Sequence, residues 1–353
     1  MHISYNRDRI PQALQWFFSI FVGDLNLISY SDIIELSEKL CSSSPGFFIR
    51  KLNPIRSNRV RHHWNSGSIP QINWWNIPYV RSRWNRLISE DPNIDYIKYT
   101  LYFLERHKKF NTKKASMLSI GCGTGSQELA FAQTGALEHI DAFDLAPNNI
   151  IEAQIASQKA QLESVLHFQV ADFQSFKPNK PYDLILFHSS LHHLNPVLSA
   201  LKKTASWLKP NGFLIVNEYA GPNRIQWNSD QLQLANRLLL TLPKELRTYP
   251  SGRLKTRQTA PGILRMHISD PSEAPDSQAI IPTLNTLFKQ ELFKGYGGNI
   301  LAPLLKGISH HFIESNPKTK DILDMLFEEE DRFLFNHPSD HFVGIYSLKT
   351  RES

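Results

Sequence analysis

The chain has 353 residues, is 41% hydrophobic and 20% charged, and carries a net charge of +6, which is ordinary for a soluble globular protein. No apolar run approaches the roughly 20 residues of a membrane helix, and the best candidate, 13–22, is followed by no small-residue cleavage site. We therefore expect neither a membrane span nor a signal peptide. Two cysteines, Cys41 and Cys122, cannot form a disulfide framework, which favours a reducing, cytoplasmic location.

Residues 1–114 carry a net charge of +8, and we expect them to form a mostly helical N-terminal lid or accessory region. Between Glu38 and Glu90 there is no acidic residue, and basic side chains are mixed with tryptophans. Such a mixture can bind an anionic or nucleic-acid partner. Because the charges are scattered rather than in one dense run, we favour a solvated basic face. The basic residues of this window are Lys39, Arg50, Lys51, Arg56, Arg59, Arg61, Arg81, Arg83 and Arg86.

Residues 115–220 alternate short apolar runs with amphipathic stretches, which is the βαβ pattern of a parallel sheet. In the second of the helices expected there, Ile151, Ile155 and Ala156 would form the apolar face. The expected strands are 116–120, 139–143, 166–170, 182–187 and 213–217, and the expected helices are 127–133, 148–162 and 197–208.

The last third of the chain is more mixed. Six prolines between 243 and 282 predict a loop-rich lid rather than sheet, and within it 270–273 would form a turn that begins and caps a helix. Further strands are expected at 288–296 and 341–348, with a helix over 301–335 between them. We therefore expect one domain over 115–353, with lid insertions at about 221–285 and 299–337.

A glycine-rich turn, Gly121-Cys122-Gly123-Thr124-Gly125, follows the first expected strand and precedes a helix. Glycines let the backbone approach a ligand closely, and the helix N-terminus offers unpaired N–H groups. In doubly wound folds, ligands lie at the carboxyl ends of the strands. The third glycine comes one residue earlier than in the dinucleotide pattern G-x-G-x-x-G, so the turn alone is weak evidence.

Acidic residues at two following strand ends strengthen the signal. Asp144 ends the second expected strand, where a carboxylate can accept hydrogen bonds from both hydroxyls of a ribose. Asp172 ends the third, where its oxygen can accept from an adenine amino group, and Phe173 beside it can pack on the adenine ring. Together, these features predict a nucleotide-like cofactor.

From Met117 to Tyr219 the chain resembles the class I S-adenosylmethionine (SAM)-dependent methyltransferases in its glycine turn, its two acids and its L-K-P-N-G turn at 208–212. The resemblance implies SAM as cofactor and a doubly wound, Rossmann-like α/β fold, with a seven-stranded sheet whose last strand is antiparallel. The later E-Y-x-G-P pattern resembles a bacterial subgroup with helical N-terminal extensions. The resemblance implies that Gly121, Gly123 and Gly125 face SAM, that Asp144 binds its ribose and that Asp172 binds its adenine. Further cofactor-binding candidates are Ser119, Cys122, Leu145, Phe173 and His188.

One position departs from the family pattern. Ser119 stands where an acidic residue usually contacts the methionine ammonium group of SAM. Serine can accept one hydrogen bond but carries no charge, so another residue must help to hold that group. At the carboxylate end of SAM, Arg81 or Arg83 is a candidate partner.

Catalytic candidates follow the fourth and fifth strands. His192 or His193 can deprotonate an acceptor hydroxyl near neutral pH, or can simply begin the next helix. Glu218 can accept a substrate hydrogen bond or act as a base, and Tyr219 can line the pocket. His188 ends its strand and is expected to line the cofactor pocket. The histidines lack a nearby carboxylate or cysteine in the sequence, so we expect no metal site.

Three functions remain open. The first is a SAM-dependent enzyme that methylates oxygen or nitrogen of a small molecule inside a closed pocket. The second is an RNA or other nucleic-acid methyltransferase that uses the basic N-terminal region, although 188–191 lacks the N-P-P-Y type of motif that often follows the fourth strand in DNA amino-methylating enzymes. The third is a non-catalytic binding subunit with the same fold. Neither the acceptor nor the oligomeric state follows from the sequence.

Overall fold

The structure is a computed structural model that describes residues 27–35, 72–314 and 316–349. Cys41, the apolar run 13–22 and the part of the basic window before residue 72 lie outside the described residues. Within them, no helix combines the length and apolar character that a bilayer crossing requires.

A single mixed sheet organises the described chain. Its strands are β1 (Ser116–Ile120), β2 (His139–Asp144), β3 (Leu166–Val170), β4 (Tyr182–His188), β5 (Leu208–Tyr219), β6 (Phe288–Gly297) and β7 (His341–Leu348). They lie in the order β3-β2-β1-β4-β5-β7-β6. The first five run parallel, whereas β7 is antiparallel to both of its neighbours. The predicted doubly wound, seven-stranded fold with an antiparallel last strand is confirmed.

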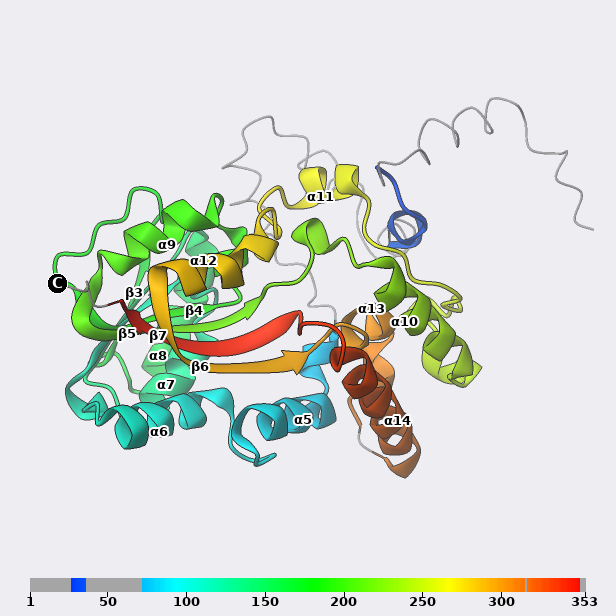
Figure 1. Cartoon of the computed structure of the whole chain (residues 1–353), viewed down its shortest axis with the longest axis horizontal. Coiled ribbons are helices and arrows are strands. Elements are labelled where there is room, and N and C mark those ends of the chain that lie inside the picture. Colours follow the sequence, from blue (N-terminus) through cyan, green and yellow to red (C-terminus); the bar gives the residue numbers. More distant parts are fainter. Residues whose placement is uncertain (1–26, 36–71, 315, 350–353) are drawn as a thin grey trace, which may run out of the picture.

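Helices cover both faces of the sheet (Figure 1). One face packs against α6 (Tyr96–Lys108), α7 (Ser126–Gln133) and α8 (Pro147–Lys159), and the other against α9 (Val197–Ala205) and α12 (Ile280–Leu287). β4 shows why both faces are covered. Leu184 and Leu186 belong to the first core cluster, whereas Ile185 and Phe187 belong to the second. Successive side chains of a strand point to opposite faces, so a continuous apolar run needs a helical layer on each side.

The prediction that Ile151 and Ile155 form the apolar face of α8 is wrong. Ile151 and Ile155 are 53% and 45% exposed, whereas Ile150 and Ala153 are buried. The reason is close packing beside the glycine turn. A Cβ placed on Gly125 would stand 2.8 Å from the Cβ of Ala153, so the small side chain of Ala153 must face the turn. The larger isoleucines are therefore left on the solvent side of the helix.

Two further boundaries differ from expectation. α9 ends at Ala205, and β5 starts at Leu208 rather than at residue 213. A register shift lies where β5 passes from its pairing with Tyr182 to its pairing with Leu184. The residues around the predicted 208–212 turn are thus part of an irregular strand, because a bulge can absorb the extra residues without ending the pairing.

A third apolar cluster lies past the carboxyl ends of the parallel strands (Figure 1), where helices from distant parts of the chain meet. These are α5 (Pro78–Ser89), α10 (Ser229–Thr241), α13 (Leu301–Leu305) and α14 (Pro317–Leu334). The continuous helix expected over 301–335 is therefore broken, since Gly307 takes a positive φ of 78° and Pro317 starts a new helix. The proline-rich segment 243–282 contributes no strand to the sheet and includes the short helix α11 (Ile263–Ser269).

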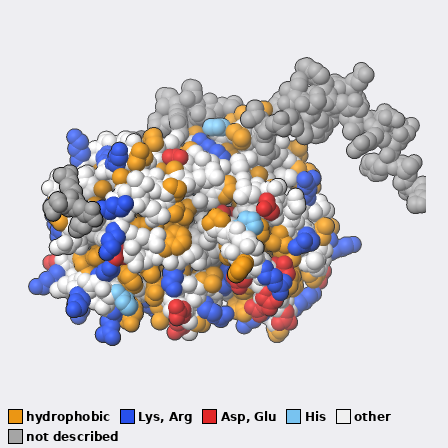
Figure 2. Space-filling model, viewed as in Figure 1, with side chains coloured by type: hydrophobic (Ala, Val, Ile, Leu, Met, Phe, Trp, Pro, Cys, Tyr) orange, Lys and Arg blue, Asp and Glu red, His pale blue; other side chains and the backbone are white. Residues whose placement is uncertain are grey.

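Charged side chains are dispersed over the described surface. Figure 2 shows Lys and Arg spread across the visible face, with several carboxylates toward the end of the molecule that holds α14. Among the described residues, the visible face has no single dense basic patch.

Candidate active site

The glycine turn joins β1 to α7 at the carboxyl edge of the sheet. The N–H groups of Gly121 and Cys122 both donate to the carbonyl of Phe143 at the end of β2, at 2.9 and 3.1 Å. These bonds tie the turn to the neighbouring strand. The positive φ of Gly125, 77°, then leads directly into α7, a conformation that costs little only for glycine.

The glycine turn is closely packed at one glycine and open at another. A Cβ on Gly121 would stand 2.8 Å from the Cβ of Ser190, so the turn packs closely on the loop after β4. By contrast, a Cβ on Gly123 would meet nothing within 4 Å. The turn is thus closely packed at Gly121 and open at Gly123, as a cradle for a nucleotide-like group requires.

Asp144 lies at the end of β2, beside this opening. Its Oδ2 accepts a hydrogen bond from the N–H of Gly123 at 2.9 Å, and its Oδ1 accepts from Ala146 at 2.8 Å. These bonds hold the carboxylate in place, and each oxygen keeps a further lone pair for a ribose hydroxyl. Leu145 is half-buried beside it. Burial raises the pKa of the Cys122 thiol, so that side chain stays neutral in the turn.

The adenine end is only partly as expected. Asp172 is exposed beyond the end of β3, and its Oδ1 accepts from the N–H of Gln174 at 2.8 Å. Phe173, however, is only 7% exposed and packs in the core against Trp207, with Lys203 over its ring. Its large apolar ring gains more from burial in that cluster than from the surface. We therefore withdraw the expectation that Phe173 stacks on adenine.

Arg83 is also placed differently from our expectation. Its guanidinium is buried and lies 3.1 Å from Glu330 Oε2 and 2.5 Å from Asp331 Oδ1, both on α14. These carboxylates satisfy the charge and fasten α5 to α14. Arg83 is therefore a structural ion-pair partner and not a free partner for the SAM carboxylate. Arg81 lies exposed on the same helix.

His188 ends β4 and contacts α6. Its Nδ1 lies 3.1 Å from the hydroxyl of Tyr96, and the two rings stack with centroids 5.5 Å apart. The same hydroxyl donates to Gln127 at the start of α7. Burial lowers the pKa of His188 to about 4, so its ring is neutral and can serve as a hydrogen-bonding wall.

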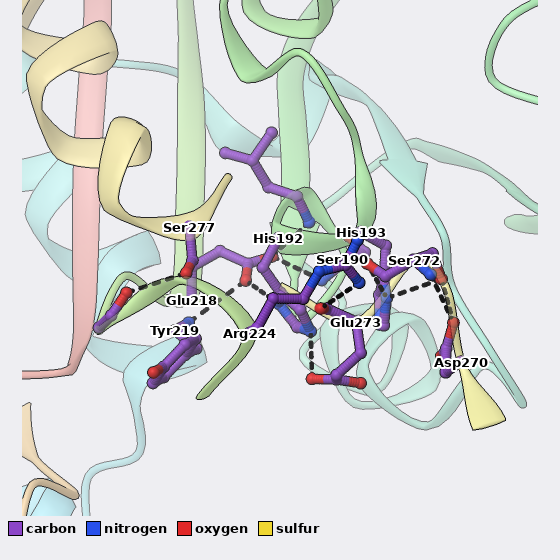
Figure 3. Close-up of polar contacts among 12 residues, drawn as sticks. Ser190, His192, His193, Glu218, Tyr219, Arg224, Asp270, Ser272, Glu273 and Ser277 are labelled. Carbon is purple, nitrogen blue, oxygen red and sulfur yellow. Dashed lines mark hydrogen bonds and ion pairs between the residues drawn. The ribbon is translucent and has the colours of Figure 1, made fainter. Parts of the chain in front are cut away.

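Glu218 is the central buried charge of the second half of the site. It is fully buried in β5, and its Oε1 accepts from the backbone N–H groups of Ser190 and Leu191, at 2.5 and 2.6 Å. Its Oε2 lies 2.6 Å from Nδ1 of His192 (Figure 3). One carboxylate thus shapes the loop after β4 and orients the histidine. The ion pair and these N–H groups outweigh burial and lower the pKa of Glu218.

His192 is held as the partner of Glu218. Burial opposes a charge on its ring, but the attraction and hydrogen bond of Glu218 outweigh that effect and raise the pKa of His192 to about 9. Because Nδ1 faces Glu218, Nε2 points the other way, toward Glu273. The ring of Tyr219 stands edge-on to His192, and its hydroxyl donates to the carbonyl of Pro222 at 2.8 Å. The arrangement can move a proton at Nε2.

A cap segment, residues 270–274, covers His192 and His193 on the side away from Glu218. Nδ1 of His193 lies 3.2 Å from the carbonyl of Ser272, and Arg224 donates to the carbonyls of Pro271 and Glu273. The expectation that this segment begins a helix is wrong. It follows the end of α11, and Asp270 accepts from the N–H and hydroxyl of Ser272 to form a turn.

The cap brings a carboxylate to the histidines. Ligand atoms of His192, His193 and Glu273 lie within 4.8 Å of one another. Our reason for expecting no metal, the lack of a nearby carboxylate, therefore does not hold. However, Nε2 of His192 lies 3.8 Å from Glu273 Oε1, whereas donors on a tetrahedral zinc lie about 3.3 Å apart. We interpret the cluster as an acid–base group in which His192 is held between two carboxylates.

Sequence reasoning missed two carboxylates. Segment 270–273 could close over the site, but capping of a helix was preferred for Glu273, because nothing in its local pattern indicates that it folds back onto residue 192. Glu128, in the first turn of α7, accepts the hydroxyl hydrogen bond of Ser119. An acid one helical turn after the last glycine was a usable signal for Glu128, because that turn must face β1.

Comparisons with known proteins match part of the chain to methyltransferases. Residues 94–253 match the model of a family described as a methyltransferase domain. The chain is 27% identical over 139 residues to a malonyl-[acyl-carrier protein] O-methyltransferase of Halalkalibacterium halodurans, which is 38% of this chain and 50% of that protein. It is 29% identical over 100 residues to a ubiquinone biosynthesis O-methyltransferase of Rhodopseudomonas palustris, which is 28% of this chain and 38% of that protein.

A solved structure of the plantazolicin methyltransferase BpumL in complex with SAH shares 15% identity and covers 86% of this chain and 98% of its own, with a TM-score of 0.40. The chain spans about half the length of the first curated relative. Over residues 94–253 the chain is therefore similar to methyltransferase domains, and its strand order and directions are those of the class I, SAM-dependent fold.

Proposed function

We propose that the protein transfers the methyl group of SAM to an oxygen or nitrogen of a small-molecule acceptor. The observation that carries the proposal is the contact between the glycine turn and the His192–Glu218 pair. Ser190 packs on Gly121, donates its hydroxyl to the carbonyl of Ile120 at 2.6 Å, and donates its N–H to Glu218. The loop after β4 thus connects the cofactor cradle to a proton acceptor.

SAM, when bound, supplies a methyl group on a positively charged sulfur, so that the chemistry needs mainly a nucleophile in line with the methyl–sulfur bond. His192 takes the proton that an acceptor hydroxyl loses as its oxygen bonds to carbon. Glu218 keeps Nδ1 of His192 engaged, so Nε2, on the side of Glu273, is the nitrogen left to take that proton. Tyr219 forms a wall beside that ring. The proton therefore stays on a buried histidine whose charge Glu218 stabilises.

Two features support a small acceptor. Both curated relatives are named O-methyltransferases, one for a malonyl-[acyl-carrier protein] and one for ubiquinone biosynthesis. The cap segment also covers the histidines, which favours a compact substrate over a long polymer. In this proposal 115–353 form the methyltransferase domain, 221–285 and 299–337 act as lids, and 1–114 serve as an accessory region. Oxygen is favoured over nitrogen, because a hydroxyl needs a base.

A labelled-methyl transfer assay tests the proposal. The protein is incubated with SAM carrying a labelled methyl group and with separate panels of phenols, carboxylic acids, amines and mixed RNA. We expect label in a phenol or carboxylic acid, with loss of transfer in His192→Gln. Label in RNA alone would overturn the small-molecule acceptor. Failure to bind SAM in a calorimetric titration would overturn the catalytic role and favour a binding subunit.

A further inference from the structure

Glu128 is a buried carboxylate beside the cofactor turn. It lies in the first turn of α7, three residues after Gly125, and is 1% exposed. Its Oε1 accepts a hydrogen bond of 2.5 Å from the hydroxyl of Ser119, which is also 1% exposed. Ser119 is the position at which the family pattern usually places an acid. The carboxylate is thus carried by the helix instead of the strand, and it contacts residue 119 directly.

The second oxygen of Glu128 lacks a partner. Oε2 is buried, and no donor among the described residues reaches it. No Lys or Arg of the described chain forms an ion pair with this carboxylate either. An unsatisfied buried oxygen costs about 1–3 kcal/mol, and more when the group is charged. A bound cation with N–H donors would remove that cost.

The surroundings of Glu128 place it beside the glycine turn. Burial raises the pKa values of the Cys122 thiol in the glycine turn and of the Tyr96 hydroxyl. The nearby charge of Glu128 raises both pKa values further. Tyr96 in turn contacts Gln127 and His188. Burial raises the pKa of Glu128 itself to about 7, against the opposing hydrogen bond of Ser119. A nearby cation would return the carboxylate to its charged form.

We propose that Ser119 and Glu128 act as a pair that binds the ammonium group of SAM, with Glu128 supplying the charge and Ser119 holding it in place. The inference rests on the proposed function, because it concerns the cofactor of that activity. It also explains how this chain keeps a cofactor site without an acid at residue 119.

The test compares ligands with and without the amino-acid part. Calorimetric titrations use SAM, S-adenosylhomocysteine and 5′-methylthioadenosine, which lacks the ammonium and carboxylate groups. For Glu128→Gln, we expect affinity for the first two ligands to fall about 10- to 100-fold, because a charged hydrogen bond is lost. Affinity for 5′-methylthioadenosine should stay within about twofold. Glu152→Gln, an exposed acid on α8, is the matched control and should change none of the three.

A rescue variant separates a binding role from a structural one. Ser119→Asp combined with Glu128→Gln returns a carboxylate to the strand and should recover most of the lost affinity for S-adenosylhomocysteine. If Glu128→Gln does not fold, Ser119→Ala provides the test and should weaken SAM several-fold while sparing 5′-methylthioadenosine. Equal loss for all three ligands, or no loss, would overturn the inference. Absence of SAM binding in the unmodified protein would instead overturn the proposed function.

Discussion

The ligand-facing edge of the sheet has two halves that are built by different means. The half at β1 and β2 is formed by a contiguous stretch, in which backbone N–H groups, glycines and Asp144 create the cradle. The half at β4 and β5 depends on buried side-chain charges, with Glu218 joined to His192 and a cap arriving from 270–274. Backbone geometry defines the first half, and electrostatics defines the second.

This difference determines how each half should respond to mutation and to changes of pH. A cradle made of backbone tolerates changes of pH and loses affinity one contact at a time. A buried ion pair is all-or-none, because removal of one partner leaves the other uncompensated. The half that handles the acceptor should therefore be the fragile and pH-sensitive one.

The largest effect should come from Glu218→Gln. The change leaves the His192 ring without its counter-charge and weakens the acceptor of two backbone N–H groups. We expect methyl transfer to fall roughly 10³-fold or more, and the free energy of unfolding to fall by about 3 kcal/mol. Urea unfolding and turnover measure the two effects. Unchanged stability would show that the pair is not the organising element of this half.

His192→Gln should come next. Loss of a general base lowers kcat by roughly 10²-fold or more. In the unmodified protein kcat should rise with pH up to about 9, because only the neutral ring accepts a proton and the pKa of His192 is raised to about 9. The variant should lose that rise. A pH profile that is flat in both proteins would exclude His192 as the base.

The same pair should make stability pH-dependent. The pKa of His192 is higher in the folded chain, about 9, than the roughly 6.5 of an unfolded chain. The stabilisation is therefore fully present below about pH 6.5 and is lost as pH rises through about 9. The stability difference between the unmodified protein and His192→Gln should shrink over that range in unfolding experiments. A difference that grows with pH would contradict the assignment.

Arg83→Met separates structure from cofactor binding. Because Arg83 pairs with Glu330 and Asp331, its loss should lower the free energy of unfolding by about 3 kcal/mol. SAM affinity of the folded variant should stay within about twofold. If calorimetry instead shows a large loss of SAM affinity with unchanged stability, the original expectation for Arg83 would be restored.

The smallest effect should follow metal removal. His192, His193 and Glu273 offer metal-ligand atoms, but His192 is held between two carboxylates. Dialysis against a chelator should leave kcat unchanged within about twofold. A loss that is restored by adding back zinc or magnesium would show that this cluster binds a metal.

The sequence predicts the first half of the edge better than the second. The glycine turn and Asp144 are local, and a strand–turn–helix pattern is enough to place them at a strand end. His192 and Glu218 were predicted as separate candidates, but their 2.6 Å contact depends on how β5 pairs with β4. Glu273 lies about 80 residues from the histidines along the chain, and only tertiary folding brings it to them. Local patterns could not show that approach.

Packing also explains the local errors. The exposed isoleucines of α8 and the core position of Phe173 both come from competition for space around the turn. A hydrophobicity pattern identifies apolar residues, but it does not show which of them have room to be buried in a closely packed region. Ser119 is the reverse case, because the missing acid at that position predicted a partner, and our proposal assigns that role to Glu128.

A paired SAM titration tests most directly whether the carboxyl edge of the sheet is divided into a cofactor half and an acceptor half. Asp144→Ala and His192→Gln are titrated beside the unmodified protein under one set of conditions. We predict that Asp144→Ala weakens SAM binding at least about tenfold, because a ribose contact is lost, and that His192→Gln binds within about twofold of the unmodified protein. An Asp144→Ala affinity within twofold, or an equal loss in both variants, would contradict the separation of a cofactor half from an acceptor half.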